Sequence, residues 1–174
     1  MSIALTPTSY LVLGCLALNG PATPYELKAV VNTSVGFFWS FPHSQLYSEP
    51  ARLAEAGLLS EQREHSGRRR RVFAVTDAGR DALRSWLADP VADAPEIRDL
   101  GLLKLFFGDL AGDGDVLRLG ETQAAAHRTR LELYESIVAT NPPGAAGATI
   151  RLGIAYERAA AAFWQSIVTD PPLA

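Results

Sequence analysis

The sequence LLSEQREHSGRRRRVFAVT, which spans residues 58–76, decides how the N-terminal half of this chain folds. Two short runs of β-forming residues flank Ser66-Gly67, and Gly67 supplies the backbone freedom that a tight hairpin turn needs. Four consecutive arginines, from Arg68 to Arg71, follow this pair. Because burial of unpaired cations is costly, the pattern predicts an exposed β-hairpin suited to phosphate, and a solvated charged turn is the simpler alternative.

Composition places the chain among folded proteins. The 174 residues are 48 % hydrophobic and 20 % charged, which allows one ordinary domain or a small domain with a helical extension. The single cysteine, Cys15, excludes an internal disulfide framework, and its apolar surroundings predict a small core residue. No apolar run is long enough to span a bilayer, and no basic segment precedes the first one. We therefore expect a cytoplasmic protein without a signal peptide or membrane contact.

The formal charge of -3 is unevenly distributed along the chain. Residues 1–80 contain eight Lys and Arg against six Asp and Glu, a net charge of +2. Residues 81–174 contain eight against thirteen, a net charge of -5. A basic hairpin on a near-neutral N-terminal half favours localised phosphate binding over a uniformly basic surface.

Two helices with clear start signals precede the hairpin. Thr6-Pro7 is an N-cap followed by proline at the first helical position, and Asn19-Gly20 ends that helix. Thr23-Pro24 repeats the signal, and Glu26 lies where it can close a capping box. This second helix ends near Asn32.

A third helix is predicted within HSQLYSEPARLAEAGLL, residues 43–59. Leu46, Leu53 and Leu58 form its apolar stripe, and Gly57 ends it. Pro50 conflicts with a continuous helix from residue 43, because an interior proline removes a hydrogen bond and costs roughly 3 kcal/mol. Either the regular helix begins near Ser48 after a looser turn, or the helix is kinked.

A fourth helix follows the hairpin, with Thr76 as its cap and Leu83, Trp86 and Leu87 on its buried face. Residues 1–90 therefore have the order helix, helix, helix, hairpin, helix. That order predicts a winged helix-turn-helix, in which the third helix lies in a major groove of DNA and the hairpin forms a two-stranded wing along the backbone. The fold class is mainly α.

Beyond a proline-bounded linker at residues 91–95, three helical stretches are predicted at residues 96–110, 113–140 and 150–168. The middle stretch places Leu117, Ala124, Leu131 and Val138 seven residues apart, a coiled-coil-like seam that Gly120 and His127 weaken. Long helices with a seam need a partner, within the chain or across a two-fold axis. We favour a homodimer, so residues 95–170 are predicted to form a helical dimerisation domain that suits a palindromic operator.

The combined pattern of residues 5–90 resembles the PadR family of transcriptional regulators. The resemblance rests on residues 6–18, Tyr25-Glu26-Leu27, residues 39–59 with Gln45-Leu46-Tyr47, residues 71–79 and Trp86-Leu87. Ser48 and Pro50 depart from the family pattern in the third helix. The resemblance implies a dimeric repressor whose first and last helices build the interface, and a small aromatic or hydrophobic effector held near it.

Candidate site residues follow from these expectations. Residues predicted to contact double-stranded DNA are Tyr25, His43, Ser44, Gln45, Tyr47, Arg52, Arg68, Arg69, Arg70 and Arg71. Residues predicted to line an effector pocket, if they are not simply core aromatics, are Trp39, Trp86, Phe106 and Trp164. The chain lacks a phosphate-binding glycine loop, a nucleophile elbow and metal-ligand spacing, so no enzyme activity, cofactor or metal is expected. The alternative function is a winged-helix protein–protein interaction module that does not bind DNA.

Overall fold

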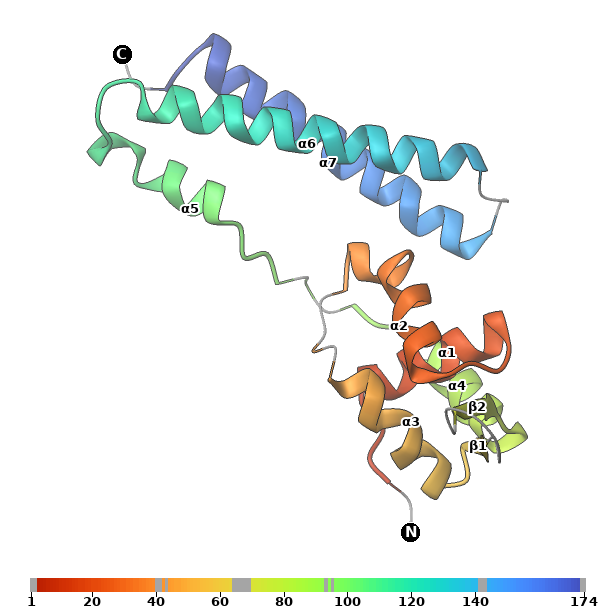
Figure 1. Cartoon of the computed structure of the whole chain (residues 1–174). Coiled ribbons are helices and arrows are strands. Elements are labelled where there is room, and N and C mark those ends of the chain that lie inside the picture. The colour runs from red at the N-terminus through yellow and green to blue at the C-terminus, as the bar shows by residue number, and fades with distance from the viewer. Residues whose placement is uncertain are drawn as a thin grey trace. The chain divides into compact units, whose positions relative to one another are not determined.

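The computed structural model describes residues 3–39, 42, 44–63, 70–92, 94, 96–140 and 144–172. The chain divides into two compact units, residues 1–93 and 94–174, and each is considered by itself. The structure is mainly α-helical, with one two-stranded antiparallel sheet among the described residues (Figure 1).

The N-terminal unit has the predicted order of elements. Its elements are α1 (Pro7–Asn19), α2 (Pro24–Asn32), a 3₁₀ turn η1 (Val35–Phe37), α3 (Gln45–Glu55), β1 (Leu59–Arg63), β2 (Arg71–Val75) and α4 (Asp77–Ala88). Thr6, Thr23 and Thr76 cap α1, α2 and α4 as predicted, and each threonine hydroxyl accepts a hydrogen bond from a backbone N–H three residues on. The start signals in the sequence therefore place these three helices correctly.

One apolar core holds this unit together. α1, α2, α3 and both strands contribute to it, and Val12, Leu13, Val31, Leu46 and Leu53 are completely buried. Cys15 lies in this core as predicted, and burial raises the pKa of its thiol to about 11. The core fixes α3 against α1 and leaves one side of α3 in solvent.

The two strands form the wing, defined here as β1, β2 and the residues that join them. Their register pairs Leu59 with Val75 and Arg63 with Arg71. Phe73, at the centre of β2, is 1 % exposed and exchanges two backbone hydrogen bonds with Ala22, at 2.9 and 3.0 Å. The wing is thus attached to the body of the unit through both its core side chain and its backbone. The predicted turn at residues 66–67 lies outside the described residues.

Pro50 lies inside α3, so the expectation that the regular helix begins near Ser48 is wrong. The helix begins at Gln45, and Pro50 is buried beyond its first turn. The start of α3 is tight, because Gln45 N–H donates to the Pro42 carbonyl at 2.9 Å and Tyr47 N–H donates to the Ser44 carbonyl at 3.1 Å. Burial of Leu46 and of the proline ring in the core offsets the hydrogen bond that Pro50 lacks.

α4 does not bury the face predicted for it. Trp86 is 43 % exposed and Leu87 is 66 % exposed, whereas Leu83 packs against the core. The Trp86 indole instead stacks on the Tyr10 ring of α1, with centroids 4.6 Å apart and planes 7° apart. Helical spacing predicts a shared face, but of these three residues only Leu83 packs against the core of this unit.

The C-terminal unit consists of α5 (Leu100–Phe106), a 3₁₀ turn η2 (Gly108–Leu110), α6 (Asp115–Thr140) and α7 (Ala145–Thr169). A single helix from residue 96 to residue 110 was expected, but α5 is shorter. It begins after Asp99, whose side chain accepts hydrogen bonds from the N–H groups of Gly101 and Leu102. α6 begins two residues after the predicted Asp113 cap, and α7 begins five residues before residue 150. α6 and α7 pack along their length as a helical hairpin (Figure 1).

The seam between α6 and α7 differs from the predicted one. Leu117 is 36 % exposed, whereas Val116, Gly120, Ala124 and His127 are buried. Gly120 lies at this seam because α7 comes close there: a Cβ on Gly120 would lie 3.1 Å from Val168 Cγ2. The small residue expected to weaken the seam therefore allows the close packing.

His127 is part of a buried ionic cluster that the sequence did not predict. Its Nδ1 lies 2.5 Å from Glu157 Oε2 of α7, and Arg130 Nε donates to the same carboxylate at 3.1 Å. Glu157 is 5 % exposed, and its ion pair with Arg130 satisfies the requirement that a buried carboxylate be paired.

Among the described residues, no helix has the length and hydropathy needed to cross a bilayer.

Candidate nucleic-acid interface

The first two turns of α3 separate polar from apolar side chains. Leu46 and Pro50 face the core, and Ser44, Gln45, Tyr47 and Ser48 are exposed. Tyr47 is 49 % exposed, and its ring has no core role comparable to that of Leu46. Helical spacing thus places a polar, partly aromatic edge at the start of α3, where a recognition helix contacts bases and phosphates.

A second set of polar contacts joins α3 to α1 and to Ala4, which precedes α1. Ser9 Oγ donates to Glu49 Oε1 at 2.6 Å, and Arg52 donates to the same carboxylate through Nη2 at 2.6 Å and Nε at 2.9 Å. Arg52 Nη1 also donates to the Ala4 carbonyl at 3.2 Å. We call Ser9, Glu49, Arg52 and the Ala4 carbonyl the α1–α3 clamp.

The clamp lowers the pKa of Glu49 and holds the Arg52 side chain. Hydrogen bonding by Arg52 is the main reason that the pKa of Glu49 lies below its ordinary value, although burial opposes the shift. The Arg52 guanidinium has three partners within the protein, so it holds α3 in place. The predicted contact of Arg52 with DNA stays a prediction.

Gln45 is held by α1 as well. Thr8 Oγ1 donates to Gln45 Oε1 at 2.8 Å across 37 positions in sequence. Thr8 is 9 % exposed, whereas Gln45 is exposed at the first position of α3. A predicted base-reading residue thus has one end of its amide attached to the domain.

The wing arginines fall into three groups. Arg71 pairs with Glu61 through Nε at 2.8 Å and Nη2 at 2.9 Å, and its guanidinium lies 5.2 Å from the centroid of the Phe73 ring. Together with Arg63, Arg71 lowers the pKa of Glu61 to about 2. Arg70 is exposed, whereas Arg68 and Arg69 lie outside the described residues. His43 lies outside them too. Glu61 is thus shared by Arg63 and Arg71 and neutralises part of the wing's charge, and Arg63 and Arg70 are both exposed.

Tyr25 lies in the first turn of α2, next to Glu26. It is 74 % exposed. Glu26 beside it closes the predicted capping box by accepting from Thr23 N–H at 2.8 Å, and that bond is the main cause of its lowered pKa, to which the positive charge of Arg70 also contributes. α2 therefore contributes an exposed tyrosine ring and a carboxylate that is already engaged.

The predicted effector residues are divided between the two units. Trp39 and Trp86 belong to the N-terminal unit, where Trp86 stacks on Tyr10. In the C-terminal unit Phe106 is 80 % exposed, whereas Trp164 is 1 % exposed and forms the core between α6 and α7. Trp164 is therefore a core residue, the simpler of the two readings of these aromatics.

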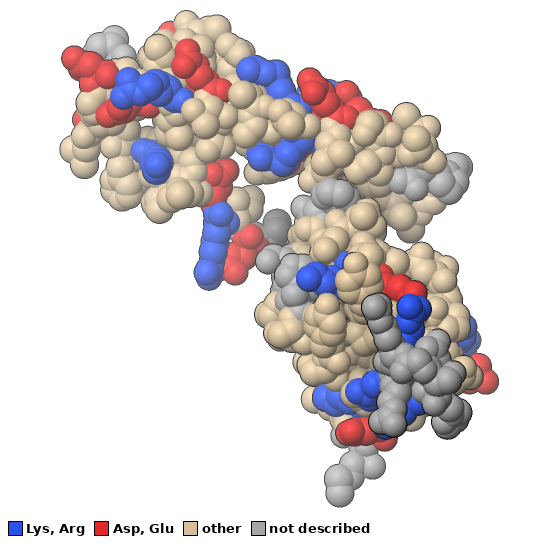
Figure 2. All heavy atoms as spheres, in the orientation of Figure 1, with Lys and Arg blue, Asp and Glu red and all other residues tan. Residues whose placement is uncertain are grey.

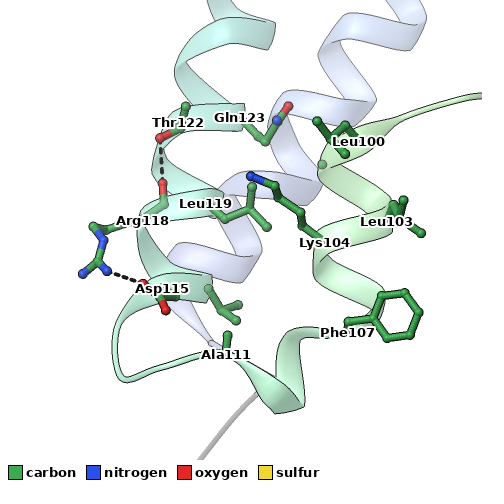
Figure 3. Close-up of a pocket in the computed structure, with 12 residues that line it drawn as sticks. Leu100, Leu103, Lys104, Phe107, Ala111, Asp115, Arg118, Leu119, Thr122 and Gln123 are labelled. Carbon is green, nitrogen blue, oxygen red and sulfur yellow. Dashed lines mark hydrogen bonds and ion pairs between the residues drawn. The ribbon is translucent and has the colours of Figure 1, made fainter.

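A groove of about 910 Å³ lies between α5 and α6 and includes none of those four residues. Leu100, Leu103, Phe107 and Leu119 supply much of its apolar lining. The Lys104 ammonium and the Gln123 amide extend between the two helices, and Arg118 pairs with Asp115 at one end (Figure 3). Most of the residues that line the groove are exposed.

The sequence did not reveal which side chains support the site. Glu49 and Arg52 are three residues apart on one helix, a spacing that could have indicated an ion pair. The bonds from Thr8 and Ser9 join residues about 40 positions apart, and no local pattern predicts them.

Figure 2 shows basic and acidic side chains interspersed over the visible face of the C-terminal unit, which lacks a single-sign patch there.

The geometry defines a winged helix-turn-helix domain. Three helices, α1 to α3, precede a two-stranded wing that carries arginine, and α3 has an exposed polar edge. Residues 12–85 match the transcriptional regulator PadR-like family, and residues 97–169 match the family described as virulence activator alpha C-term. The chain belongs to the PadR-like family of transcriptional regulators, whose members are regulators rather than enzymes.

Individual relatives agree with this assignment. The negative transcriptional regulator PadR of Bacillus subtilis is 25 % identical over 140 residues, which cover 77 % of this chain and 76 % of that protein. The crystal structure of B. subtilis PadR in complex with operator DNA has a TM-score of 0.82 at 19 % identity and covers 96 % of this chain and 99 % of that one. A structure of the same protein with p-coumaric acid has a TM-score of 0.76 at 20 % identity, covering 92 % and 96 %.

Proposed function

We propose that this regulator is a homodimeric repressor that binds palindromic operator DNA through α3 and the wing. The observation that carries the proposal is the exposed polar edge of α3, held in place by the α1–α3 clamp beside a wing with an exposed arginine. The fold that this chain shares with B. subtilis PadR, which has been crystallised with operator DNA, supports the proposal.

The two elements have different roles in this proposal. α3 enters the major groove, where Gln45 contacts base edges and Tyr47 contacts a base or a phosphate. Arg68, Arg69 and Arg70 follow the backbone and supply affinity without sequence information. Ser44, Tyr25 and His43 complete the contacts around the start of α3. Arg71 contributes less than its neighbours, because Glu61 already holds it.

A homodimer accounts for the apolar surface of the C-terminal unit. α5 and its flanks leave several large apolar side chains in solvent, namely Ile97, Leu100, Leu103, Phe106, Phe107 and Leu110. Exposure of this extent is typical of a surface that another chain covers. In sedimentation velocity at micromolar concentration we expect a single species of twice the chain mass. A monomer would contradict the proposed dimerisation domain.

We also propose that a small aromatic or hydrophobic molecule releases the protein from DNA in the cytoplasm. The similar fold of B. subtilis PadR, solved with p-coumaric acid, supports this. A panel of phenolic acids and apolar aromatics, titrated into the protein–operator complex, should contain a member that dissociates it. The absence of release by every member would contradict the proposed effector class.

The salt dependence of binding tests the role assigned to the wing. We expect Arg70→Ala to weaken binding to all duplexes alike and to reduce the slope of log K against log salt by about one unit, because one phosphate contact is lost. Arg151→Ala, an exposed arginine of the C-terminal unit, is the matched control and should leave the slope unchanged. A loss confined to one operator sequence would contradict the backbone role, and salt-independent binding would favour a protein–protein module.

A further inference from the structure

Thr8 and Gln45 form a polar contact between α1 and the exposed start of α3. Thr8 Oγ1 donates to Gln45 Oε1 at 2.8 Å. Thr8 is 9 % exposed, so its hydroxyl is fixed by the packing of α1, whereas Gln45 extends from the solvent side of α3. The side chain that would read a base is thus attached at its oxygen to a buried group of another helix.

The neighbouring clamp makes this contact rigid. Ser9, the next residue of α1, donates to Glu49 at 2.6 Å, and Glu49 lies one helical turn beyond Gln45 on α3. Two consecutive residues of α1 therefore hold two successive turns of α3. The buried bond between Ser9 and Glu49 thus holds the backbones of the two helices together next to the bond between Thr8 and Gln45.

The direction of the bond determines what Gln45 presents to solvent. The amide oxygen accepts from Thr8, so the Nε2 group, which carries two N–H donors, is the end of the amide left for a ligand. An unattached glutamine samples several rotamers and both amide orientations, and it loses that freedom on binding. A glutamine held by Thr8 is ordered before it meets DNA.

We propose that Thr8 is a positioning residue that sets the base preference of Gln45. Thr8 orients the amide so that Nε2 donates to an acceptor in the major groove, N7 or O6 of a purine, and disfavours a base whose amino group, N6 of adenine or N4 of cytosine, faces Nε2. The inference rests on the proposed operator binding and adds that specificity at one base pair depends on a buried residue of α1 that does not touch DNA.

The test compares base discrimination in variants of the full chain. A duplex selected by the wild type from a random pool is substituted at each position, and Gln45→Ala identifies the base pair whose discrimination it removes. We expect Thr8→Val, which keeps the shape and removes the hydroxyl, to reduce discrimination at that pair about fivefold, in line with loss of one hydrogen bond. Thr8→Ser should retain it. Thr129→Val, at an exposed threonine of α6 whose hydroxyl donates to the Ala125 carbonyl, is the matched control.

The double variant separates positioning from a general effect on folding. In the Gln45→Ala background, Thr8→Val should not reduce discrimination further, whatever it does to thermal stability. Wild-type discrimination in Thr8→Val, or equal losses in Thr8→Ser and Thr8→Val, would overturn the inference while leaving operator binding intact. Absence of sequence preference in the wild type would instead overturn the proposed function.

Discussion

Trp164→Ala lowers the free energy of unfolding of the C-terminal unit by about 3–5 kcal/mol, the range for removing a large buried aromatic side chain. Trp164 is 1 % exposed and is the largest side chain in the core between α6 and α7, with Val116, Ala124 and Ile167 around it. The small residues Gly120 and Ala161 are also buried in this unit, so little nearby volume can fill the cavity. Urea unfolding followed by far-UV circular dichroism measures the effect without using tryptophan emission.

The adjacent residue provides the control for that experiment. Phe163 packs edge-on against Trp164 but is 43 % exposed. Phe163→Ala should therefore cost less than half as much. Both variants must be compared at one protein concentration, because a dimer makes apparent stability depend on concentration. Equal losses of unfolding free energy in the two variants would contradict the burial of Trp164 between α6 and α7.

Glu49→Ala is expected to destabilise the N-terminal unit by about 2–3 kcal/mol and to abolish operator binding. Removal of the carboxylate leaves the Ser9 hydroxyl and the Arg52 guanidinium without their shared acceptor. A broken buried pair costs about 3–5 kcal/mol, and the partial exposure of Arg52 reduces the cost here. Glu55→Ala, at the exposed end of the same helix, should change stability by less than about 0.5 kcal/mol.

The destabilisation by Glu49→Ala depends on pH in a defined direction. The pKa of Glu49 is lowered in the folded chain, so the carboxylate stabilises the fold above its unfolded pKa and loses that contribution as pH falls through the folded one. The stability difference between wild type and variant should be complete at pH 7 and should narrow below about pH 4. A difference that stays constant from pH 7 to pH 3 would mean that the clamp does not act through the charge of Glu49.

Local signals in the sequence predicted the starts of α1, α2 and α4 and the two strands of the wing. Each threonine cap followed by proline or aspartate acts within four residues, so Thr6, Thr23 and Thr76 could be identified without tertiary information. The β-forming run at residues 72–75 likewise marked the strand whose central Phe73 is buried. These local features were sufficient to predict the winged-helix order of elements.

Errors arose where packing overrides local preference. One expectation placed the regular start of α3 near Ser48 with Pro50 in its first turn, but the helix begins at Gln45 and Pro50 is buried within it. Leu87 has the spacing of a core residue, yet the part of α4 that carries it lies beyond the core. The hydrogen bond from Thr8 to Gln45 joins residues that are far apart in the sequence. No local pattern predicts this bond, so the role that we infer for Thr8 in specificity could be identified only from the structure.

Selection of bound duplexes from a random pool by the purified protein tests whether the chain is a homodimeric operator-binding regulator. We expect a palindrome whose half-sites lie one helical turn apart, about 34 Å, because two copies of α3 related by a two-fold axis contact successive major-groove faces. The enriched duplex should also bind with steep salt dependence. A pool that remains random after repeated rounds, or a single half-site without symmetry, would contradict a homodimeric operator-binding regulator.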